Sequence, residues 1–514
     1  MTVFRSCHHG PTRADACKPG CAARRGARGL TGLSILLVLC ILAGCKPVGP
    51  NYTRPTYTPP PAYKETGAPT VIVPPPNPNG GSWQPASPSD GLLRGKWWEI
   101  YQDPQLNALE ERIATYNQGL RQALETYRAA SDQIKVARAN LYPTLSAGPS
   151  FAHDKNSSHR PLSAASTATN YNDMILEGQG SWEPDFWGRI RRTVEAAHEN
   201  AQASAADMAN VDLSLQAQMA TAYFQLRGAD SLTQMLTATV SDLESQLDLT
   251  RKRLKGGVAT EVDVAQAQTQ LETVRAQLVD VGQARAQFEH AVGTIADYKL
   301  PGFSIPFSPL NIQVPNIPLG VPSQLLERRP DIAAAERRTA AANAQIGIQK
   351  AAFYPTISLG GTGGFESTHG GTWIQGPSAL WGLGAQATEL LFDAGQRHAL
   401  TDQARHTWEA QVAAYKGAVF LAFEDVEDQL SSLRVLEQES GVEQAAVASA
   451  QHSLDISNQR YKGGVTTYLE VLTAEATLLQ NQQTAVGLQT REFVSSVALV
   501  RSLGGGWDTT QLPK

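Results

Sequence analysis

The chain has 514 residues, of which 42% are hydrophobic, 18% charged and 7% aromatic, and its formal net charge is −5. This length can bury substantial cores in several domains, while the mild acidity, without a basic stripe, argues against nucleic-acid binding. The only continuous apolar run, residues 30–43, is too short for a spanning helix. A membrane protein built of helical spans is therefore excluded.

Residues 1–44 have the pattern of an export signal. A basic leader precedes the apolar run, and small residues follow it directly before Cys45. Leu-Ala-Gly-Cys at 42–45 resembles the bacterial lipobox, whose cysteine is acylated and becomes the first mature residue; an ordinary signal peptide with a chance cysteine is the alternative. We predict a lipoprotein signal peptide over 1–44 and a lipid on Cys45. The residue after Cys45 is Lys46, whereas an inner-membrane retention signal would resemble Asp at this position. The absence of that signal favours passage to the outer membrane.

Proline divides the rest of the chain. Residues 45–90 are rich in Pro, Ser and Asn and are expected to form an extended, solvated tether. No proline occurs at 185–300 or at 378–512. Because proline disrupts helix interiors, these two spans, rich in Ala, Gln, Leu and Glu, predict long helices. All five cysteines lie in the first 45 residues, so no disulfide or cysteine-based metal site is expected in the mature chain.

The body of the chain is a tandem duplication. RLKGGVAT at 253–260 recurs as RYKGGVTT at 460–467, and LYPTLS at 141–146 recurs as FYPTIS at 353–358. The matches keep the same order, which makes chance unlikely. We therefore divide the chain into a first repeat at 91–300, a Pro-rich linker at 301–322, a second repeat at 323–507 and a tail at 508–514.

Each repeat predicts the same order of elements. A helix (about 105–140, then 323–352) ends at Tyr-Pro and is followed by two short strands. In the second repeat Ile357 and Phe365 share one face of a strand, and Ser358 and Thr362 share the other. A 68-residue helix then runs to Lys255 or Lys462 and turns at Gly-Gly into a return helix. A heptad seam indicates that these helices pair as coiled coils: Leu236, Val240, Leu243, Leu247 and Leu254.

Local signals define the hairpin turns. Gly256 and Gly463 are predicted to end the long helices in the positive-φ conformation that glycine favours. Thr260 with Asp263, and Thr467 with Glu470, match capping boxes at the start of the return helices.

Four strands per chain constrain the assembly. Strands with an outward apolar face need a hydrophobic neighbour, and only a closed set of strands leaves no unpaired edge in lipid. Four strands are too few to close, so spanning strands require oligomers: a dimer supplies eight strands and a trimer twelve, with an open lumen. A four-stranded sheet packed on helices in a soluble domain is the alternative.

The motifs together resemble the outer-membrane factors of bacterial tripartite efflux pumps, the TolC and OprM type, especially their NodT-like lipoprotein branch. The resemblance covers 45 to about 507. It is carried by CKPVGPNY at 45–52, WW at 97–98, DPQL at 103–106, WEPDFWG at 182–188, LERRPDI at 326–332, FYP at 353–355 and LGGGW at 503–507.

The resemblance implies an α+β membrane protein: a homotrimer with a twelve-stranded outer-membrane β-barrel, four strands per chain, continued by a periplasmic coiled-coil helical barrel. An equatorial belt would draw on linker 301–322 and both ends of the mature chain. The implied partners are two further copies, a periplasmic membrane-fusion adaptor, an inner-membrane pump of the RND type, and outer-membrane lipid.

The resemblance also implies roles for particular residues. The hairpin tips would contact the adaptor: Gly256, Gly257, Val258, Gly463, Gly464 and Val465. Asp263 and Glu470 would form the acidic part of the periplasmic gate; Glu470 aligns with a gate aspartate of the family, whereas the next acidic position is Thr473 here. We further hypothesise that Tyr461 belongs to the gate and helps Glu470 to hold the closed tip. For Asp263 and Glu470, helix capping alone is the alternative. Trp182, Phe186 and Trp187 are candidate aromatic residues of the membrane interface, with simple core packing as the alternative.

No catalytic or phosphate-binding pattern stands out, and no cofactor or metal is expected besides the lipid on Cys45. We expect a passive conduit that carries small molecules such as drugs, toxic compounds or metal ions out of the cell, and no enzyme. Two alternatives remain: the same kind of channel in type I protein secretion, and a non-channel coiled-coil lipoprotein scaffold.

Overall fold

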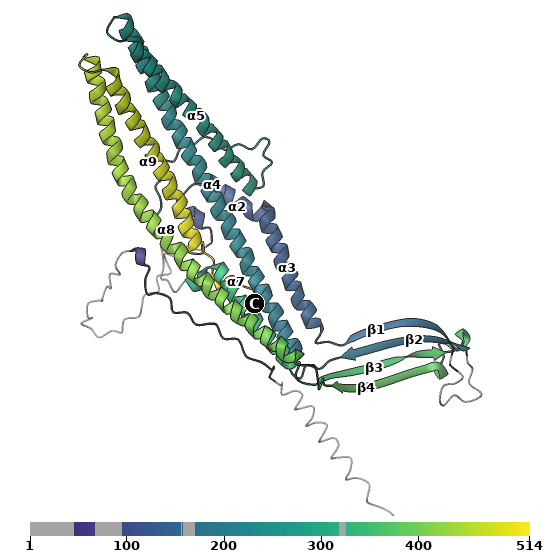
Figure 1. Ribbon diagram of the computed structural model, residues 1–514. Coiled ribbons are helices and arrows are strands. Elements are labelled where there is room, and N and C mark those ends of the chain that lie inside the picture. Colours follow the sequence, from purple (N-terminus) through teal and green to yellow (C-terminus); the bar gives the residue numbers. More distant parts are fainter. Residues whose placement is uncertain (1–45, 67–94, 156, 158–169, 318–324, 514) are drawn as a thin grey trace, which may run out of the picture.

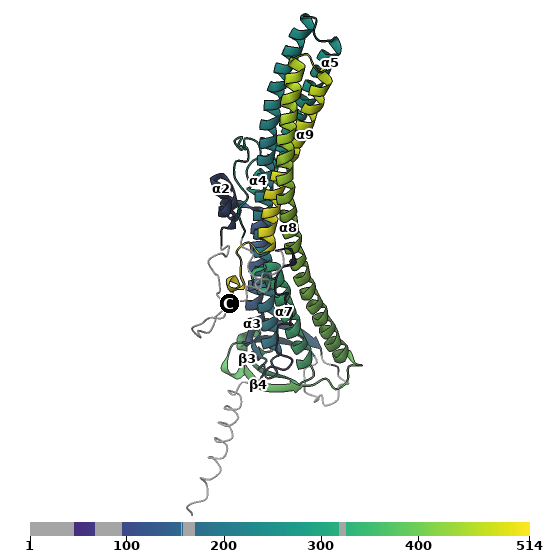
Figure 2. The same ribbon diagram turned by 90° about the vertical axis from the view of Figure 1, so that its left-hand side faces the viewer.

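The computed structural model describes residues 46–66, 95–155, 157, 170–317 and 325–513. The expected signal peptide, Cys45 and parts of the expected tether and linker lie outside these residues. Long helices form a rod, and the strands form an arm that projects from one end of it (Figure 1). The opposite end of the rod is made by two helical hairpins, which lie close together in the narrow column seen in Figure 2.

Two pairs of long helices confirm the predicted duplication. Helices α4 (Arg189–Lys255) and α8 (Gln396–Lys462) have 67 residues each, and their return helices α5 (Glu261–Ile295) and α9 (Tyr468–Ser502) have 35 each. A helix of α4's length extends about 100 Å at 1.5 Å per residue. Besides its partner α5, α4 packs against α9, so the two hairpins contact each other along the rod.

Shorter helices cover the half of the rod nearest the strands. These are α2 (Pro104–Tyr116), α3 (Gln118–Ala139), α6 (Leu325–Arg328) and α7 (Pro330–Ala351). The sequence predicted a single helix over 105–140, but Asn117 interrupts it. The Asn117 backbone is extended, and its Oδ1 accepts a hydrogen bond from the Leu120 amide at 3.0 Å, which caps α3. Similarly, Arg329 is extended before Pro330, which separates α6 from α7.

Single 3₁₀ turns complete the helical elements. They are η1 (Lys64–Thr66), η2 (Trp97–Tyr101), η4 (Gly370–Thr372), η5 (Gly376–Ser378) and η6 (Thr509–Gln511).

The strands form one antiparallel sheet in the order β1-β2-β3-β4. They are β1 (Thr144–Lys155), β2 (Asn170–Trp182), β3 (Thr356–Ser367) and β4 (Ala379–Thr388). The two central strands come from different repeats, and their register places Leu176 opposite Phe365. The edge strands β1 and β4 each have only one neighbour among the described strands.

The register gives the sheet one apolar and one polar face, as the alternating sequence predicted. Pro149, Leu176 and Phe365 lie in one row across three strands, and Trp381 and Leu383 of β4 share their parity. The opposite parity carries Glu177, Gln179, Thr362 and Gln386. The large apolar side chains at the edges are exposed, because the helices pack at the end of the sheet and not on its face.

Two hydrophobic cores hold the helices together. The larger core lies in the middle of the rod, where Phe224 of α4 stacks on Phe493 of α9 at 4.8 Å and contacts the ring of Tyr101 at 4.8 Å. The second core runs between the hairpins and contains Leu243 and Leu271, in agreement with the predicted heptad seam. Both of these cores, and a small third cluster of Ala206, Ala333 and Ala334, contain residues of both repeats, so the two repeats share their cores in the described part of the chain.

The N-terminal segment 46–66 is extended, as expected, but it lies along the helices and is not free in solvent. The Val48 amide donates to the Trp187 carbonyl at 2.9 Å, and Asn343 Nδ2 of α7 donates to the Pro50 carbonyl at 3.1 Å. Further on, the Lys64 amide donates to Glu427 Oε1 of α8 at 2.7 Å. This segment therefore connects the sheet end of the rod with its middle.

No helix in the described part of the chain is both long and apolar enough to cross a membrane.

Candidate functional site

The two hairpin turns have the same geometry. At the end of α4 the Val258 amide donates to the Arg253 carbonyl and the Gly257 amide to the Leu254 carbonyl, both at 2.9 Å. This is the Schellman arrangement, in which the residue after the helix cap takes a left-handed conformation. That residue is Gly257, with φ of 77°, and not Gly256, whose φ is −80°.

The second turn repeats these contacts. The Val465 amide donates to the Arg460 carbonyl at 2.9 Å, and the Gly464 amide donates to the Tyr461 carbonyl at 3.0 Å. Gly464 has φ of 72°, whereas Gly463 has −76°. The expectation of positive φ at Gly256 and Gly463 was thus wrong by one residue, because the cap itself is still helical. The valines that follow the glycines are exposed, Val258 by 65% and Val465 by 70%, so each tip presents an apolar side chain.

The two acidic residues proposed for the gate differ in their contacts. Asp263 closes a capping box with Thr260: its Oδ2 accepts from the Thr260 amide at 2.8 Å, and Thr260 Oγ1 accepts from the Asp263 amide at 3.3 Å. The matching box was predicted wrongly at Thr467, whose side chain makes no capping hydrogen bond within the described chain. Glu470 instead faces Arg460, with Oε2 at 3.7 Å from Nη1, and both side chains are about half exposed. Helix capping therefore does not explain Glu470.

Tyr461 is buried at the contact between the hairpins. Its ring lies 5.5 Å from the ring of Tyr468, the first residue of α9. Arg253 comes from the other hairpin, at the end of α4. Its guanidinium lies over the Tyr461 ring, with Cζ 4.5 Å from the ring centre. Arg253 Nη1 also donates to the Lys462 carbonyl at 3.2 Å. The sequence carries no signal for this contact of Arg253 between the hairpins, because it depends on how the two hairpins pack.

The other end of the rod carries the predicted interface aromatics. Trp182 ends β2 on the apolar face, and its Nε1 donates to the Leu141 carbonyl at 2.9 Å. Trp187 stacks on Tyr354 at 4.8 Å and donates from Nε1 to the Pro355 carbonyl at 2.7 Å, and Phe186 lies beside it in the turn before α4. These residues thus mark the junction of sheet and helices.

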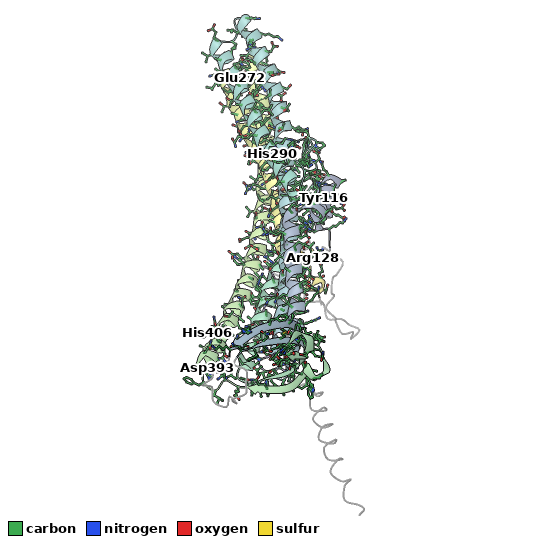
Figure 3. All side chains as sticks on the ribbon, turned by 90° about the vertical axis from the view of Figure 1, so that its right-hand side faces the viewer. Tyr116, Arg128, Glu272, His290, Asp393 and His406 are labelled. Carbon is green, nitrogen blue, oxygen red and sulfur yellow. The ribbon has the colours of Figure 1, made fainter. Side chains whose placement is uncertain are left out.

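The structure adds apolar residues to this end that sequence analysis did not single out. Trp381 and Leu383 of β4 are exposed by 79% and 82%. Leu390, Leu391 and Phe392, in the connection from β4 to α8, are also exposed. The alternation of Trp381 and Leu383 with glycines was the available signal. Figure 3 shows Asp393, the next residue of this connection, at the sheet end, and Glu272 of α5 toward the opposite end.

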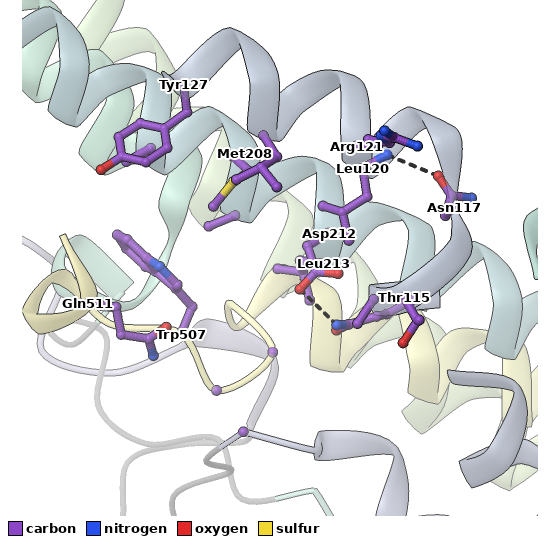
Figure 4. Close-up of a pocket in the computed structure, with 18 of the residues that line it drawn as sticks. Thr115, Asn117, Leu120, Arg121, Tyr127, Met208, Asp212, Leu213, Trp507 and Gln511 are labelled. Atoms are coloured by element: carbon purple, nitrogen blue, oxygen red, sulfur yellow. Dashed lines mark hydrogen bonds between the residues drawn. The ribbon is translucent and has the colours of Figure 1, made fainter. Parts of the chain in front are cut away.

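A groove of about 990 Å³ lies beside the central core, between α3, α4 and the C-terminal segment. Tyr127, Met208 and Trp507 line it together with Asp212, whose Oδ2 accepts from Gln216 Nε2 at 3.0 Å (Figure 4). Burial raises the pKa of Asp212. The pKa of Glu110 on α2 is also raised, by burial and by the negative charge of Asp212. Among the described residues, no group of three or more His, Cys, Asp or Glu side chains could hold a metal ion.

Comparison with known proteins gives a consistent result. The family model described as outer membrane efflux protein matches residues 108–296 and 321–505, one segment in each half of the chain. Toluene efflux pump outer membrane protein TtgF of Pseudomonas putida is 30% identical over 481 residues, which cover 93% of this chain and 97% of the relative. Pyoverdine export outer membrane protein OpmQ of Pseudomonas aeruginosa is 29% identical over 428 residues, 82% of this chain and 90% of the relative.

Solved structures share the fold. The outer-membrane channel OprN has a TM-score of 0.80 and 27% identity, covering 90% of this chain and 99% of that one. CusC, which forms a transmembrane channel, has a TM-score of 0.78 and 26% identity, covering 89% of this chain and 99% of that one. The open state of the Neisseria gonorrhoeae MtrE outer-membrane channel has a TM-score of 0.75 and 26% identity over 90% and 98%.

Proposed function

The chain belongs to the outer membrane efflux protein family, and from this premise we propose that three copies form a passive outer-membrane conduit for small molecules. The observation that carries the proposal is the two-faced sheet at the end of a long helical rod. An apolar face suits lipid, a polar face suits a water-filled lumen, and the rod continues the path away from the membrane.

The free edges of the sheet support the trimer. The edges of β1 and β4 must pair in lipid, and four strands are too few to close on themselves. Pairing β1 of one copy with β4 of the next closes a ring, and three copies supply twelve strands. In a barrel of roughly eight strands the side chains fill the interior, so an open lumen requires more strands than that.

The position of the N-terminal segment supports a lipid anchor on Cys45. Val48 is hydrogen-bonded to Trp187, at the junction of sheet and helices, only three residues beyond Cys45. An acyl chain on Cys45 could therefore reach the membrane surface without moving residues 46–52 from α4 and α7. Replacing Cys45 by alanine should abolish the incorporation of labelled palmitate, and continued incorporation would overturn the assignment.

The hairpin tips support docking to a periplasmic adaptor that connects the channel to an inner-membrane pump. Val258 and Val465 are exposed at the end of the rod farthest from the sheet, and the same Schellman turn presents both. Two similar apolar tips per chain give six around a trimer, a repeat that a ring of adaptor subunits could match.

Relatives named for toluene efflux and pyoverdine export indicate small molecules as the class of cargo for this chain. Two measurements on the detergent-solubilised full-length chain test the proposal: the mass of the complex and its conductance in planar bilayers. We expect the mass of three chains and discrete ion-conducting steps. A monomeric or dimeric, non-conducting protein would instead indicate a coiled-coil scaffold. Deleting the gene and measuring export separates small-molecule cargo from secreted protein.

A further inference from the structure

A polar cavity of about 400 Å³ lies where the two helical hairpins meet, between α4, α8 and α9. Its walls include Leu454, Leu478 and Leu479, but most of the side chains that line it are polar. The polar residues include Asp242 and Gln246 of α4, Asp455 of α8 and Glu475 of α9. Burying polar groups between helical hairpins costs free energy unless the groups are hydrogen-bonded. Their presence in this interface therefore requires an explanation.

Glu475 is the group at the centre of this contact. Its residue is only 4% exposed, and its Oε1 accepts a hydrogen bond from Gln246 Nε2 at 2.9 Å, directly across the interface. Its second oxygen, Oε2, and Gln246 Oε1 are buried and have no hydrogen-bond partner within the described chain. An ionised carboxylate would leave an acceptor unsatisfied here, whereas a protonated carboxyl removes the charge and adds a donor.

The described side chains that line the cavity offer Glu475 no compensating cation. Asp242 faces it from α4 and Asp455 from α8, and none of the described residues lining the cavity is Lys, Arg or His. On α9 itself, Tyr468 interacts electrostatically with Glu475, and its buried hydroxyl has no hydrogen-bond partner among the described atoms. Burial raises the pKa of Glu475 to about 7. The hydrogen bond from Gln246 acts against this rise, and the negative charge of Asp242 adds to it.

We propose that Glu475 is a proton-controlled joint between the two hairpins: its protonated form keeps α9 packed against α4, and its ionised form draws water into the cavity and loosens the contact. This role of Glu475 is separate from conduction. Only its consequence rests on the proposed function: in a channel, the hairpins would separate more easily as the pH rises. Glu475 lies about two turns beyond Tyr468, the first residue of α9, close enough to the tip for such loosening to reach Tyr461 and Tyr468.

The direction of the pH effect follows from the raised pKa. Once the contact opens to water, the carboxyl regains its usual pKa of 4.5. The packed arrangement therefore has its full stability below that value, loses stability as the pH rises towards about 7, and changes little above it. A pKa difference of this size allows a change of at most a few hundredfold in the equilibrium between packed and loosened hairpins.

Hydrogen exchange of the full-length trimer in detergent tests the proposal. Exchange rates of peptides covering 239–250 and 471–482 are compared between the wild type and Glu475→Gln at each pH from 4.5 to 8. Glutamine keeps the size of the side chain but cannot ionise, and the ratio of the two proteins at one pH cancels the intrinsic pH dependence of exchange. We expect wild-type protection, relative to Glu475→Gln, to fall roughly tenfold across this range.

Glu437→Gln serves as the matched control, because Glu437 is an exposed carboxylate on α8 outside the cavity. This variant should follow the wild type. If the Glu475→Gln trimer does not assemble, the wild type alone, corrected for intrinsic exchange, must show the same loss with rising pH. A wild-type ratio that stays constant, or a Glu437→Gln protein that loses the pH dependence, would overturn the proposal. Since exchange reports on the helices and not on conduction, failure here and failure of the channel function are distinguishable.

Discussion

The guanidinium carbon of Arg253 lies 4.5 Å from the centre of the Tyr461 ring, so the end of α4 rests on the end of α8. Arg253 comes from the first repeat and Tyr461 from the second, and the same guanidinium donates a hydrogen bond to the Lys462 carbonyl at 3.2 Å. One side chain therefore joins the two hairpin tips of a chain, at the place where a periplasmic gate is proposed.

Replacing Arg253 by glutamine should loosen the tips. The cation–π contact and the hydrogen bond across the hairpins are lost, at a cost of about 1 kcal/mol, and we expect a larger resting conductance in planar bilayers. Arg251→Gln is the control, because Arg251 Nη2 donates to Gln268 of α5 at 2.9 Å, within its own hairpin. Equal conductance of the two variants would show that Arg253 does not restrain the tips.

Replacing Glu470 by glutamine tests whether this residue belongs to the gate. Three copies of an exposed carboxylate around a pore favour cations, so the variant should show lower cation selectivity or altered single-channel conductance. Its stability should hardly change, since an exposed ion pair contributes at most about 1 kcal/mol. Asp263→Asn should instead weaken the capping box of α5 by about 1 kcal/mol. Unchanged conductance and selectivity in Glu470→Gln would remove the gate assignment.

Alanine at the two glycines of the second tip should have opposite consequences. Gly464 has φ of 72°, a conformation that costs a residue with a Cβ about 1–2 kcal/mol. Gly463 has φ of −76°, and the nearest atom to an added Cβ lies at 3.5 Å, so alanine fits there. We expect Gly464→Ala to lower the thermal unfolding temperature of the trimer and Gly463→Ala to leave it unchanged or raise it. The reverse order would contradict the assigned turn.

Lysine on the apolar face of the sheet should prevent membrane assembly. Leu383 is 82% exposed on that face, and lysine in the middle of a lipid-facing strand costs about 2–4 kcal/mol. We expect Leu383→Lys to yield little trimer in the outer-membrane fraction. Gln386→Lys, three residues further along β4 on the opposite face, should assemble normally. Normal assembly of both variants would argue that the apolar face does not contact lipid.

The sequence predicted best those features that local chemistry determines. Proline-free spans, the heptad seam around Leu243 and the repeated Gly-Gly turns set the helix lengths and their pairing. Alternation in β3 predicted the faces of the sheet. The break at Asn117 was missed because its side chain caps a helix inside a span with continuous helical periodicity.

Contacts between distant segments were harder to infer. Thr467 and Glu470 match a capping box as well as Thr260 and Asp263 do, but a charged neighbour across the turn, Arg460, lies near Glu470 in the folded chain. The position of Arg253 over Tyr461 depends on how two hairpins pack, and no local spacing encodes it. The gate and lipid assignments stay predictions until the Glu470 and Cys45 variants are measured, and the adaptor contact of the tips stays a prediction as well.

The pairing of β2 with β3 has a consequence for how the protein reaches its folded state. Residues Met174–Trp182 find their partners in β3 only after the whole first hairpin and the linker have been exported, because Leu359–Ser367 belong to the second repeat. An isolated two-stranded hairpin is marginally stable in water, and its unpaired edge invites aggregation. The chain should therefore depend on a periplasmic chaperone between export and insertion, and it should tolerate truncation after the first repeat poorly.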